Sequence, residues 1–188
     1  HVPKLMHQNG SDDAPAALSN LLEFLARKLK MRVSTQKRLL SMTDETLLDF
    51  HLAFIHGRRE FRISDEERKA LARFIQGGGV VIADSICASE EFTMSLRRAL
   101  SDIIPGGSWQ PIPVDHNLLP REYGGFALSR VPRRDPQARS DDDPLHAKLV
   151  RTTPTLEGLL INGRYAVLFS PYDLSCALEN TSSLECQG

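Results

Sequence analysis

The sequence predicts a single α/β domain over residues 1–188, built on a mostly parallel sheet with helices on both faces and an antiparallel hairpin near the C-terminus. Two observations support this prediction. Over residues 1–105, short apolar runs alternate with helical patterns, which is typical of βαβ units. Further along the chain, two apolar runs flank Asn162-Gly163, which predicts a tight hairpin because both turn positions need positive φ.

The first part of the chain supplies three predicted strands and a helix. Residues 2–7 are a short apolar run, and Pro15 then opens a helix whose leucines recur at helical spacing to about Lys30. Residues 31–35 (MRVST) predict a second strand, and residues 52–56 predict a third. The leucine spacing gives the helix one apolar face for packing on the sheet.

The next helix and strand have clear boundaries. Ser64 followed three residues later by Glu67 is a capping box, which predicts the start of a helix. The glycines at 77–79 end that helix, and residues 80–84 (VVIAD) predict a fourth strand. Apolar residues at helical spacing over 92–103 predict a further helix. Because the glycines precede a strand, whereas phosphate-binding loops follow one, they do not predict a phosphate site.

The second half of the sequence is less regular. Residues 106–120 contain several prolines and glycines and predict an extended loop. Residues 129–155 are charged and proline-rich, so we expect a long charged surface loop, part of it disordered. Residues 156–161 and 164–170 should pair as the antiparallel hairpin. After a loop or short helix, residues 181–188 are expected to form a frayed tail.

Composition argues against several kinds of partner. A net charge of −1 gives no overall field that attracts nucleic acid, and no run reaches the ~18 apolar residues of a membrane-spanning helix. The basic cluster at 130–135 lacks interleaved aromatic residues and is interpreted as solvated surface. Three cysteines without a CxxC spacing argue against a zinc knuckle or a disulfide framework. Two alternatives remain: a single Cys176–Cys186 disulfide bridge, or three reduced cysteines.

Polar side chains follow the apolar runs, at one edge of the predicted sheet, where open parallel sheets bind their ligands. Glycine after the third strand lets a ligand approach the backbone, and Arg58 beside it offers a planar fork to a carboxylate or phosphate. An equally acceptable interpretation is a simple turn in which Arg58 pairs with an acid such as Asp84. The predicted ligand-binding residues are His56, Gly57, Arg58, Asp84, Asp115 and Asp173.

Cys87 is the sharpest candidate for chemistry, because it lies between the fourth strand and the next helix. A helix N-terminus favours a thiolate, and His116 or His56 could act as its base. In that hypothesis Cys87 is the nucleophile and His116 the catalytic base. The glycines of a G-x-C-x-G elbow are absent, since Ile86 and Ala88 flank the cysteine. This absence favours a small inert cysteine packed where strand meets helix.

No metal or cofactor is expected. A metal site made of histidines and carboxylates from several strand ends is chemically allowed, but no HxH or HExxH spacing supports it. The candidate ligands for such a site are His7, His56, Asp84, His116 and Asp173.

Several blocks of the sequence together resemble one protein family. These blocks are His56-Gly57-Arg58, the capping-box helix with its glycines and Asp84, Asp115-His116, and Gly163-Arg164 leading to residues 172–179. They resemble the bacterial family named domain of unknown function 4159, which looks like a branch of the class I glutamine amidotransferase-like superfamily. The resemblance implies a three-layer flavodoxin-like fold. It also implies an extracytoplasmic setting, since such domains often occur within larger secreted or membrane-anchored bacterial proteins.

The chain departs from the family pattern after the fourth strand, where Ser85-Ile86-Cys87-Ala88 replaces the more usual Ala-Cys-Cys-Gly. Without the elbow, the resemblance does not imply glutaminase activity. We therefore expect an amidotransferase-like domain that binds a small polar or anionic ligand, or a protein partner, at the strand ends. The alternative is a cysteine-dependent hydrolase or transferase that uses Cys87 and His116.

Overall fold

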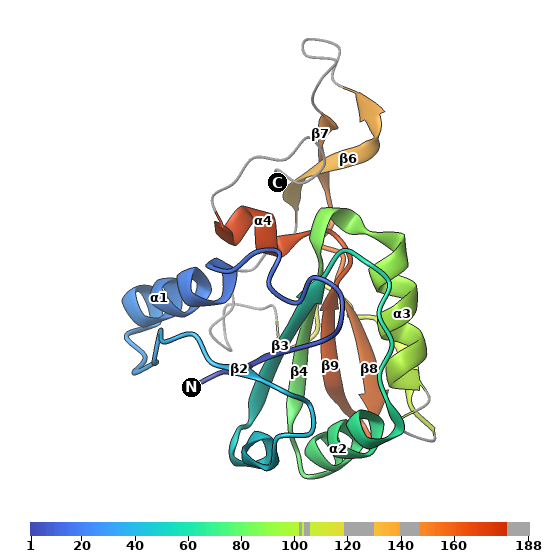
Figure 1. Cartoon of the computed structure of the whole chain (residues 1–188). Helices are drawn as coiled ribbons and strands as arrows, with labels where there is room; N and C mark the ends of the chain where they lie inside the picture. Colours follow the sequence, from blue (N-terminus) through green and yellow to red (C-terminus); the bar gives the residue numbers. More distant parts are fainter. Residues whose placement is uncertain (102, 104–105, 119–129, 140–146, 180–188) are drawn as a thin grey trace.

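The central feature of the computed structural model is a mixed, mostly parallel sheet of seven strands in the order β2-β1-β3-β4-β9-β8-β5 (Figure 1). The structure describes residues 1–101, 103, 106–118, 130–139 and 147–179. The first five strands of that order are mutually parallel, whereas β8 and β5 run antiparallel to their neighbours. The sheet strands are β1 (Lys4–Leu5), β2 (Leu39–Leu40), β3 (Leu52–Gly57), β4 (Val80–Ser85), β5 (Ser108–Pro111), β8 (Glu157–Ile161) and β9 (Arg164–Ser170).

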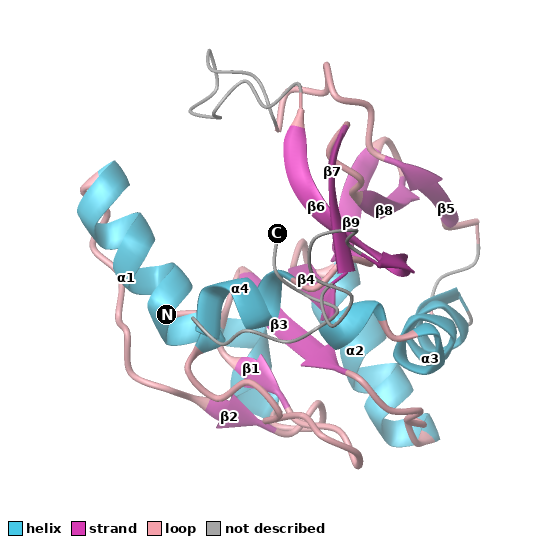
Figure 2. Cartoon of the chain, turned by 90° about the horizontal axis from the view of Figure 1, so that it is seen from above, coloured by secondary structure: helices cyan, strands magenta, loops and turns pink. Residues whose placement is uncertain are grey.

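Helices cover both faces of this sheet (Figure 2). Side chains alternate between the two faces along a strand, and the apolar clusters follow that alternation. Phe54 of β3 packs with Leu18 and Leu22 of the first helix, whereas Ala53 and its partners pack against the second and third helices. The helices are α1 (Ala17–Leu29), α2 (Asp65–Gln76), α3 (Glu90–Ser101) and α4 (Leu174–Glu179), with short 3₁₀ turns η1 (Glu45–Asp49) and η2 (Ile86–Ala88).

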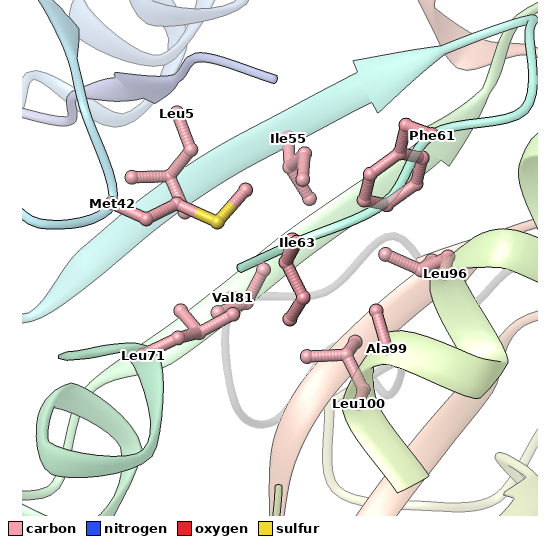
Figure 3. Close-up of a pocket in the computed structure, with 10 residues that line it drawn as sticks. All are labelled: Leu5, Met42, Ile55, Phe61, Ile63, Leu71, Val81, Leu96, Ala99 and Leu100. Carbon is pink, nitrogen blue, oxygen red and sulfur yellow. The ribbon is translucent and has the colours of Figure 1, made fainter. Parts of the chain in front are cut away.

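The side of the sheet that faces α2 and α3 is a closely packed apolar layer. Figure 3 shows its centre, where a cavity of about 10 Å³ remains between the strands and the two helices. An internal space of that size holds at most about one water molecule, so it is core packing and not a ligand site. Its lining is entirely apolar and consists of Leu5, Met42, Ile55, Phe61, Ile63, Leu71, Val81, Leu96, Ala99 and Leu100.

Local sequence signals set the boundaries of α2 and of the hairpin. The capping box is confirmed, because Ser64 and Glu67 exchange side-chain and backbone hydrogen bonds of 2.7 and 3.1 Å. The β8–β9 hairpin is also confirmed, with φ of 49° at Asn162 and 79° at Gly163. In both cases a few adjacent residues determine the backbone, so sequence was sufficient to predict it.

The predicted second strand at residues 31–35 was wrong. The strand beside β1 is β2, eight residues further along, where Leu39 pairs with Lys4. Leu40 is 6 % exposed, whereas Val33 is only partly buried against α1. Strand pairing follows the residue that can be buried beside β1, and the β-branched composition of MRVST did not decide it.

Strands also form in two segments that were expected to be loops. Residues 108–111 pair with β8 as β5, and Trp109 packs edge-on against Phe169 with ring centroids 6.1 Å apart. Within 129–155, β6 (Val131–Arg139) and β7 (Ala147–Thr152) form a separate antiparallel pair. Charge indicates exposure, but ladder hydrogen bonds use backbone groups that charged residues keep, and each proline removes only its own N–H. The expected disorder at 140–146 and the frayed tail lie outside the described residues.

None of the described helices combines the length with the apolar character that crossing a bilayer requires.

Candidate functional site

The ends of three neighbouring parallel strands place the candidate residues side by side. In the β3–β4 register His56 is opposite Asp84, and in the β4–β9 register Asp84 is opposite Ser170. His56 and Asp84 lie on the α1 face of the sheet, because they alternate with core residues of the other face. Helix α4 begins just beyond this edge (Figure 1).

Asp84 holds the first turn of α4. Its Oδ1 accepts a hydrogen bond from the Leu174 N–H at 2.8 Å, and its Oδ2 accepts one from the Ser175 N–H at 2.8 Å. The side chain is buried, and burial raises the pKa of Asp84 to about 6, with the nearby Asp173 carboxylate adding to the rise and the hydrogen bonds opposing it. Asp84 is therefore committed to an internal contact and is not available as an exposed ligand-binding group.

His56 belongs to the same buried polar network. Its Nδ1 lies 2.8 Å from Ser175 Oγ, while Nε2 has no hydrogen-bond partner among the described residues. Burial lowers the pKa of His56 to about 3, and the neighbouring Lys4 and His7 side chains add to the effect. The imidazole is thus neutral at physiological pH, and its position fixes the Ser175 hydroxyl.

Gly57 is required by packing. A Cβ at this position would come within 2.8 Å of the Phe92 ring and 3.0 Å of His7 Cε1. His7 Nε2 in turn lies 2.7 Å from the His56 carbonyl oxygen, so the first and third strands are joined at their ends. The space beside Gly57, where we had expected a ligand to approach, is filled by side chains of the protein.

Arg58 is an exposed cation at this edge. Its Nε lies 3.3 Å from Asp13 Oδ2, and its side chain is 50 % exposed. The expected alternative, pairing with Asp84, does not occur, since Asp84 is bound by backbone N–H groups. Ser89 Oγ donates to the Arg58 carbonyl at 2.7 Å, which holds Arg58 next to the turn after β4.

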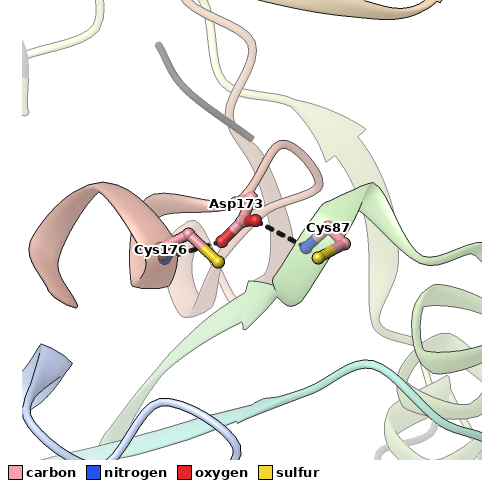
Figure 4. Close-up of side chains that lie close together, drawn as sticks. All are labelled: Cys87, Asp173 and Cys176. Carbon is pink, nitrogen blue, oxygen red and sulfur yellow. Dashed lines mark hydrogen bonds between the residues drawn. The ribbon is translucent and has the colours of Figure 1, made fainter. Parts of the chain in front are cut away.

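Asp173 joins the β4 turn to α4. Its Oδ2 accepts from the Cys87 N–H at 2.6 Å and its Oδ1 accepts from the Cys176 N–H at 2.8 Å. It is 3 % exposed and has a left-handed φ of 58°. Asp84 and Asp173 therefore act reciprocally: Asp84 at the end of β4 binds backbone N–H groups at the start of α4, and Asp173 just before α4 binds the N–H of Cys87 after β4. Figure 4 shows the Asp173 contacts.

Cys87 lies on a strained turn beside a second cysteine. Its φ is 57° and that of Ala88 is 49°, a left-handed conformation that costs non-glycine residues free energy. One ligand-type atom from each of Cys87, Asp173 and Cys176 lies within 4.8 Å of the other two (Figure 4). The two cysteines come from segments 89 positions apart, and Asp173 lies between them.

The remaining predicted residues do not join this cluster. His116 packs edge-on against Tyr165, with ring centroids 5.0 Å apart, and Asp115 is exposed beside it. The ring of Tyr165 lies against Gly158 of β8, which is opposite Leu168 in the hairpin. His116 thus packs on the β8–β9 hairpin, whereas Cys87 packs beside α4 with Cys176.

Sequence reasoning missed Ser175 as a member of this site and did not connect Cys176 with Cys87. The spacing Asp173-x-x-Cys176 at the start of a helix could have suggested that the carboxylate caps the N–H three residues later. Nothing local could have brought Cys87 to the same place, because that depends on β4 and β9 being neighbours.

Comparison with known proteins gives the family of the chain. No curated protein matches it. A family model described as "Domain of unknown function (DUF4159)" matches residues 1–188. The chain belongs to the DUF4159 family.

Proposed function

We propose that this domain is a binding module of the amidotransferase-like class that lacks the glutaminase elbow and binds a small anionic ligand at the C-terminal edge of its parallel strands. The observation that supports it most directly is the position of Arg58. Its half-exposed guanidinium lies beside the turn that contains Cys87, at the edge where open parallel sheets bind their ligands.

The charge on Arg58 is not fully used within the protein. Asp13 contacts Nε, and within the described ranges no other acidic side chain forms an ion pair with this guanidinium. Its remaining N–H donors suit a carboxylate or phosphate, which a guanidinium binds through two parallel hydrogen bonds.

The floor of the proposed site is preorganised. Asp84 and Asp173 fix the two turns through four backbone N–H groups, so a ligand would not have to order them on binding. Preorganisation of this kind reduces the entropic cost of binding.

The topology is consistent with the flavodoxin-like, three-layer arrangement that we propose for the fold. The five parallel strands are adjacent to one another in the sheet, in the order β2-β1-β3-β4-β9, and helices pack on both faces. A glutaminase is not proposed, because Ile86 and Ala88 stand where the elbow glycines would be, and because His116 packs against Tyr165.

A cysteine-dependent hydrolase or transferase is the second candidate, favoured by the left-handed backbone at Cys87. It requires a base within hydrogen-bond reach of Sγ, and the imidazole proposed for this role, His116, packs edge-on against Tyr165. Iodoacetamide labelling at neutral pH separates the candidates. Labelling of Cys87 no faster than that of a cysteine in an unstructured peptide would exclude an activated nucleophile.

The binding proposal is tested by thermal denaturation with inorganic phosphate, acetate and succinate as probes. A ligand present at 100 times its dissociation constant stabilises the folded state by about 2.7 kcal/mol, roughly 5–10 °C for a chain of this size. We expect at least one probe to raise the melting temperature of the wild type, less so for Arg58→Lys and not for Arg58→Ala.

Arg62→Ala is the matched control, because Arg62 is an arginine of the same loop whose side chain is 82 % exposed and only distantly paired with Glu60. Equal loss of the shift in Arg58→Ala and Arg62→Ala would indicate general charge screening. No shift with any of the three anions would overturn the proposal.

A further inference from the structure

The feature with the clearest unassigned chemistry is the cluster of Cys87, Asp173 and Cys176. Its three ligand-type atoms lie within 4.8 Å of one another. Tetrahedral coordination at zinc–sulfur distances of ~2.3 Å separates two sulfurs by about 3.8 Å. The two sulfurs therefore need to approach each other by about 1 Å or less to bind one ion. Small rotations of the cysteine side chains can provide this movement.

We propose that Cys87, Cys176 and Asp173 form a site for a thiophilic divalent cation, Zn²⁺ being the best match. Two sulfurs and one carboxylate are ligands that Zn²⁺ prefers, whereas Mg²⁺ and Ca²⁺ prefer all-oxygen sets. Binding would displace the two thiol protons to solvent and form two zinc–sulfur bonds and one zinc–oxygen bond. Three protein ligands leave a fourth position open.

Hydrogen bonds already orient the carboxylate of this site. The Cys87 and Cys176 N–H groups each donate to one oxygen of Asp173, at 2.6 and 2.8 Å. Each carboxylate oxygen keeps a second lone pair for a metal. Such outer contacts are typical of metal sites, where they hold the ligands in position.

The charge balance of the buried region also favours a cation. Asp173 is 3 % exposed and Asp84 is 1 % exposed, and Asp84 binds the N–H of Leu174, the residue after Asp173. In the described segments, neither carboxylate forms an ion pair with a lysine or arginine. Buried carboxylates are normally paired with a cation or coordinate a metal.

The metal site lies beside the proposed ligand edge, because Cys87 belongs to the turn whose Ser89 contacts Arg58. Cys176 is 9 % exposed, whereas Cys87 is half-buried on the turn whose Ser89 binds Arg58. A cation there would add positive charge beside Arg58 and offer its fourth position to an anionic ligand. In that respect the inference rests on the proposed function, since it names the chemistry of the same site.

The test uses the full chain, reduced and freed of metal with a chelator, and titrates it with Co²⁺ and Zn²⁺ alone. We expect one equivalent of Co²⁺ to produce a sulfur-to-cobalt charge-transfer band, which Zn²⁺ then abolishes. Cys87→Ser and Asp173→Asn should each weaken Zn²⁺ binding at least tenfold. Cys186→Ser is the matched control and should retain it.

Cys176 packs with Ala14, Ala17 and Ile86, so Cys176→Ser is expected to lower stability as well as metal binding. Cys87→Ser is the decisive variant, because its half-buried side chain tolerates a hydroxyl. Its circular dichroism and melting temperature in chelator should match the wild type.

Absence of a stoichiometric, sulfur-ligated metal in the reduced wild type would overturn the inference. So would full retention of that metal by Cys87→Ser, or its loss only in Cys186→Ser. Because no organic ligand is present, a metal can bind even if phosphate, acetate and succinate do not. The two proposals therefore fail separately.

Discussion

The carboxylate of Asp84 accepts a 2.8 Å hydrogen bond from the backbone N–H of Ser175, a residue 91 positions later in the chain. This contact ties the end of β4 to the first turn of α4. The Ser175 Oγ in turn lies 2.8 Å from Nδ1 of His56, on the neighbouring strand β3, and forms a hydrogen bond with it. A carboxylate and an imidazole that looked like ligand-binding groups are thus joined to each other through one buried serine.

Asp84 should make stability fall as pH rises. Its pKa is raised from 3.8 to about 6 in the folded protein, so between these values the folded state binds more protons than the unfolded state. The free energy of unfolding of the wild type should therefore lose roughly 3 kcal/mol from this group between pH 3.8 and 6. Asp84→Asn removes this contribution.

Urea denaturation of both proteins in chelator, from pH 4 to pH 7, tests this. Relative to the wild type, Asp84→Asn should become more stable by about 2–3 kcal/mol as pH rises across that range. Asp115→Asn, at an exposed position, is the control substitution. The same pH-independent difference for Asp84→Asn would contradict the assignment.

His56 should have the opposite dependence. Its pKa is lowered from 6.5 to about 3, so the unfolded state takes up a proton that the folded state excludes. The stability that the neutral imidazole contributes is fully present above pH 6.5 and is lost as pH falls toward 3. At about 1.4 kcal/mol per pH unit, His56→Gln should gain roughly 2–3 kcal/mol on the wild type between pH 7 and pH 4.5.

The exposed His51, just before β3, provides the control for that measurement as His51→Gln. Measured over the same pH range, it gives the effect of replacing an exposed histidine. Parallel pH profiles for wild type and His56→Gln would show that His56 is not buried as the neutral form.

Gly79 should tolerate replacement by alanine less well than Gly77, because of the contacts that an added Cβ would make. A Cβ at Gly79 would come within 2.5 Å of the buried Phe74 ring, whereas at Gly77 the nearest atom is the Arg73 carbonyl oxygen at 3.2 Å. We expect Gly79→Ala to lower the free energy of unfolding by about 1–3 kcal/mol and Gly77→Ala by under about 1 kcal/mol. Equal losses in urea denaturation would contradict this packing.

Arg164 should stabilise the end of α2 through a geometry that lysine cannot reproduce. Its guanidinium donates to the Ile75 carbonyl at 2.5 Å and to the Gly79 carbonyl at 3.3 Å. Arg164→Ala should cost about 2–3 kcal/mol, and Arg164→Lys, with one compact donor group, about half of that. Arg98→Ala, at an arginine that is 61 % exposed, should change the unfolding free energy by under about 0.5 kcal/mol.

Elements whose signals are local were predicted well from the sequence. The Ser64–Glu67 box and the Asn162-Gly163 turn each specify their backbone through residues next to one another. The parallel strand at 80–84 was recognised because a strand buried on both faces is apolar throughout. The strand at 31–35 failed, because pairing with β1 depends on which later leucine can be buried there.

The candidate site likewise has features that the sequence predicts and features that depend on the tertiary structure. The sequence by itself determined that reactive side chains follow the strands, because polar residues must stand where apolar runs end. Only the tertiary structure decided their partners: the neighbouring positions of β4 and β9 bring Cys87 to Asp173 and Cys176, while the chain after β5 takes His116 to Tyr165. The physical reason is that strand order is set by burial summed over the whole sheet, which no short stretch of sequence contains.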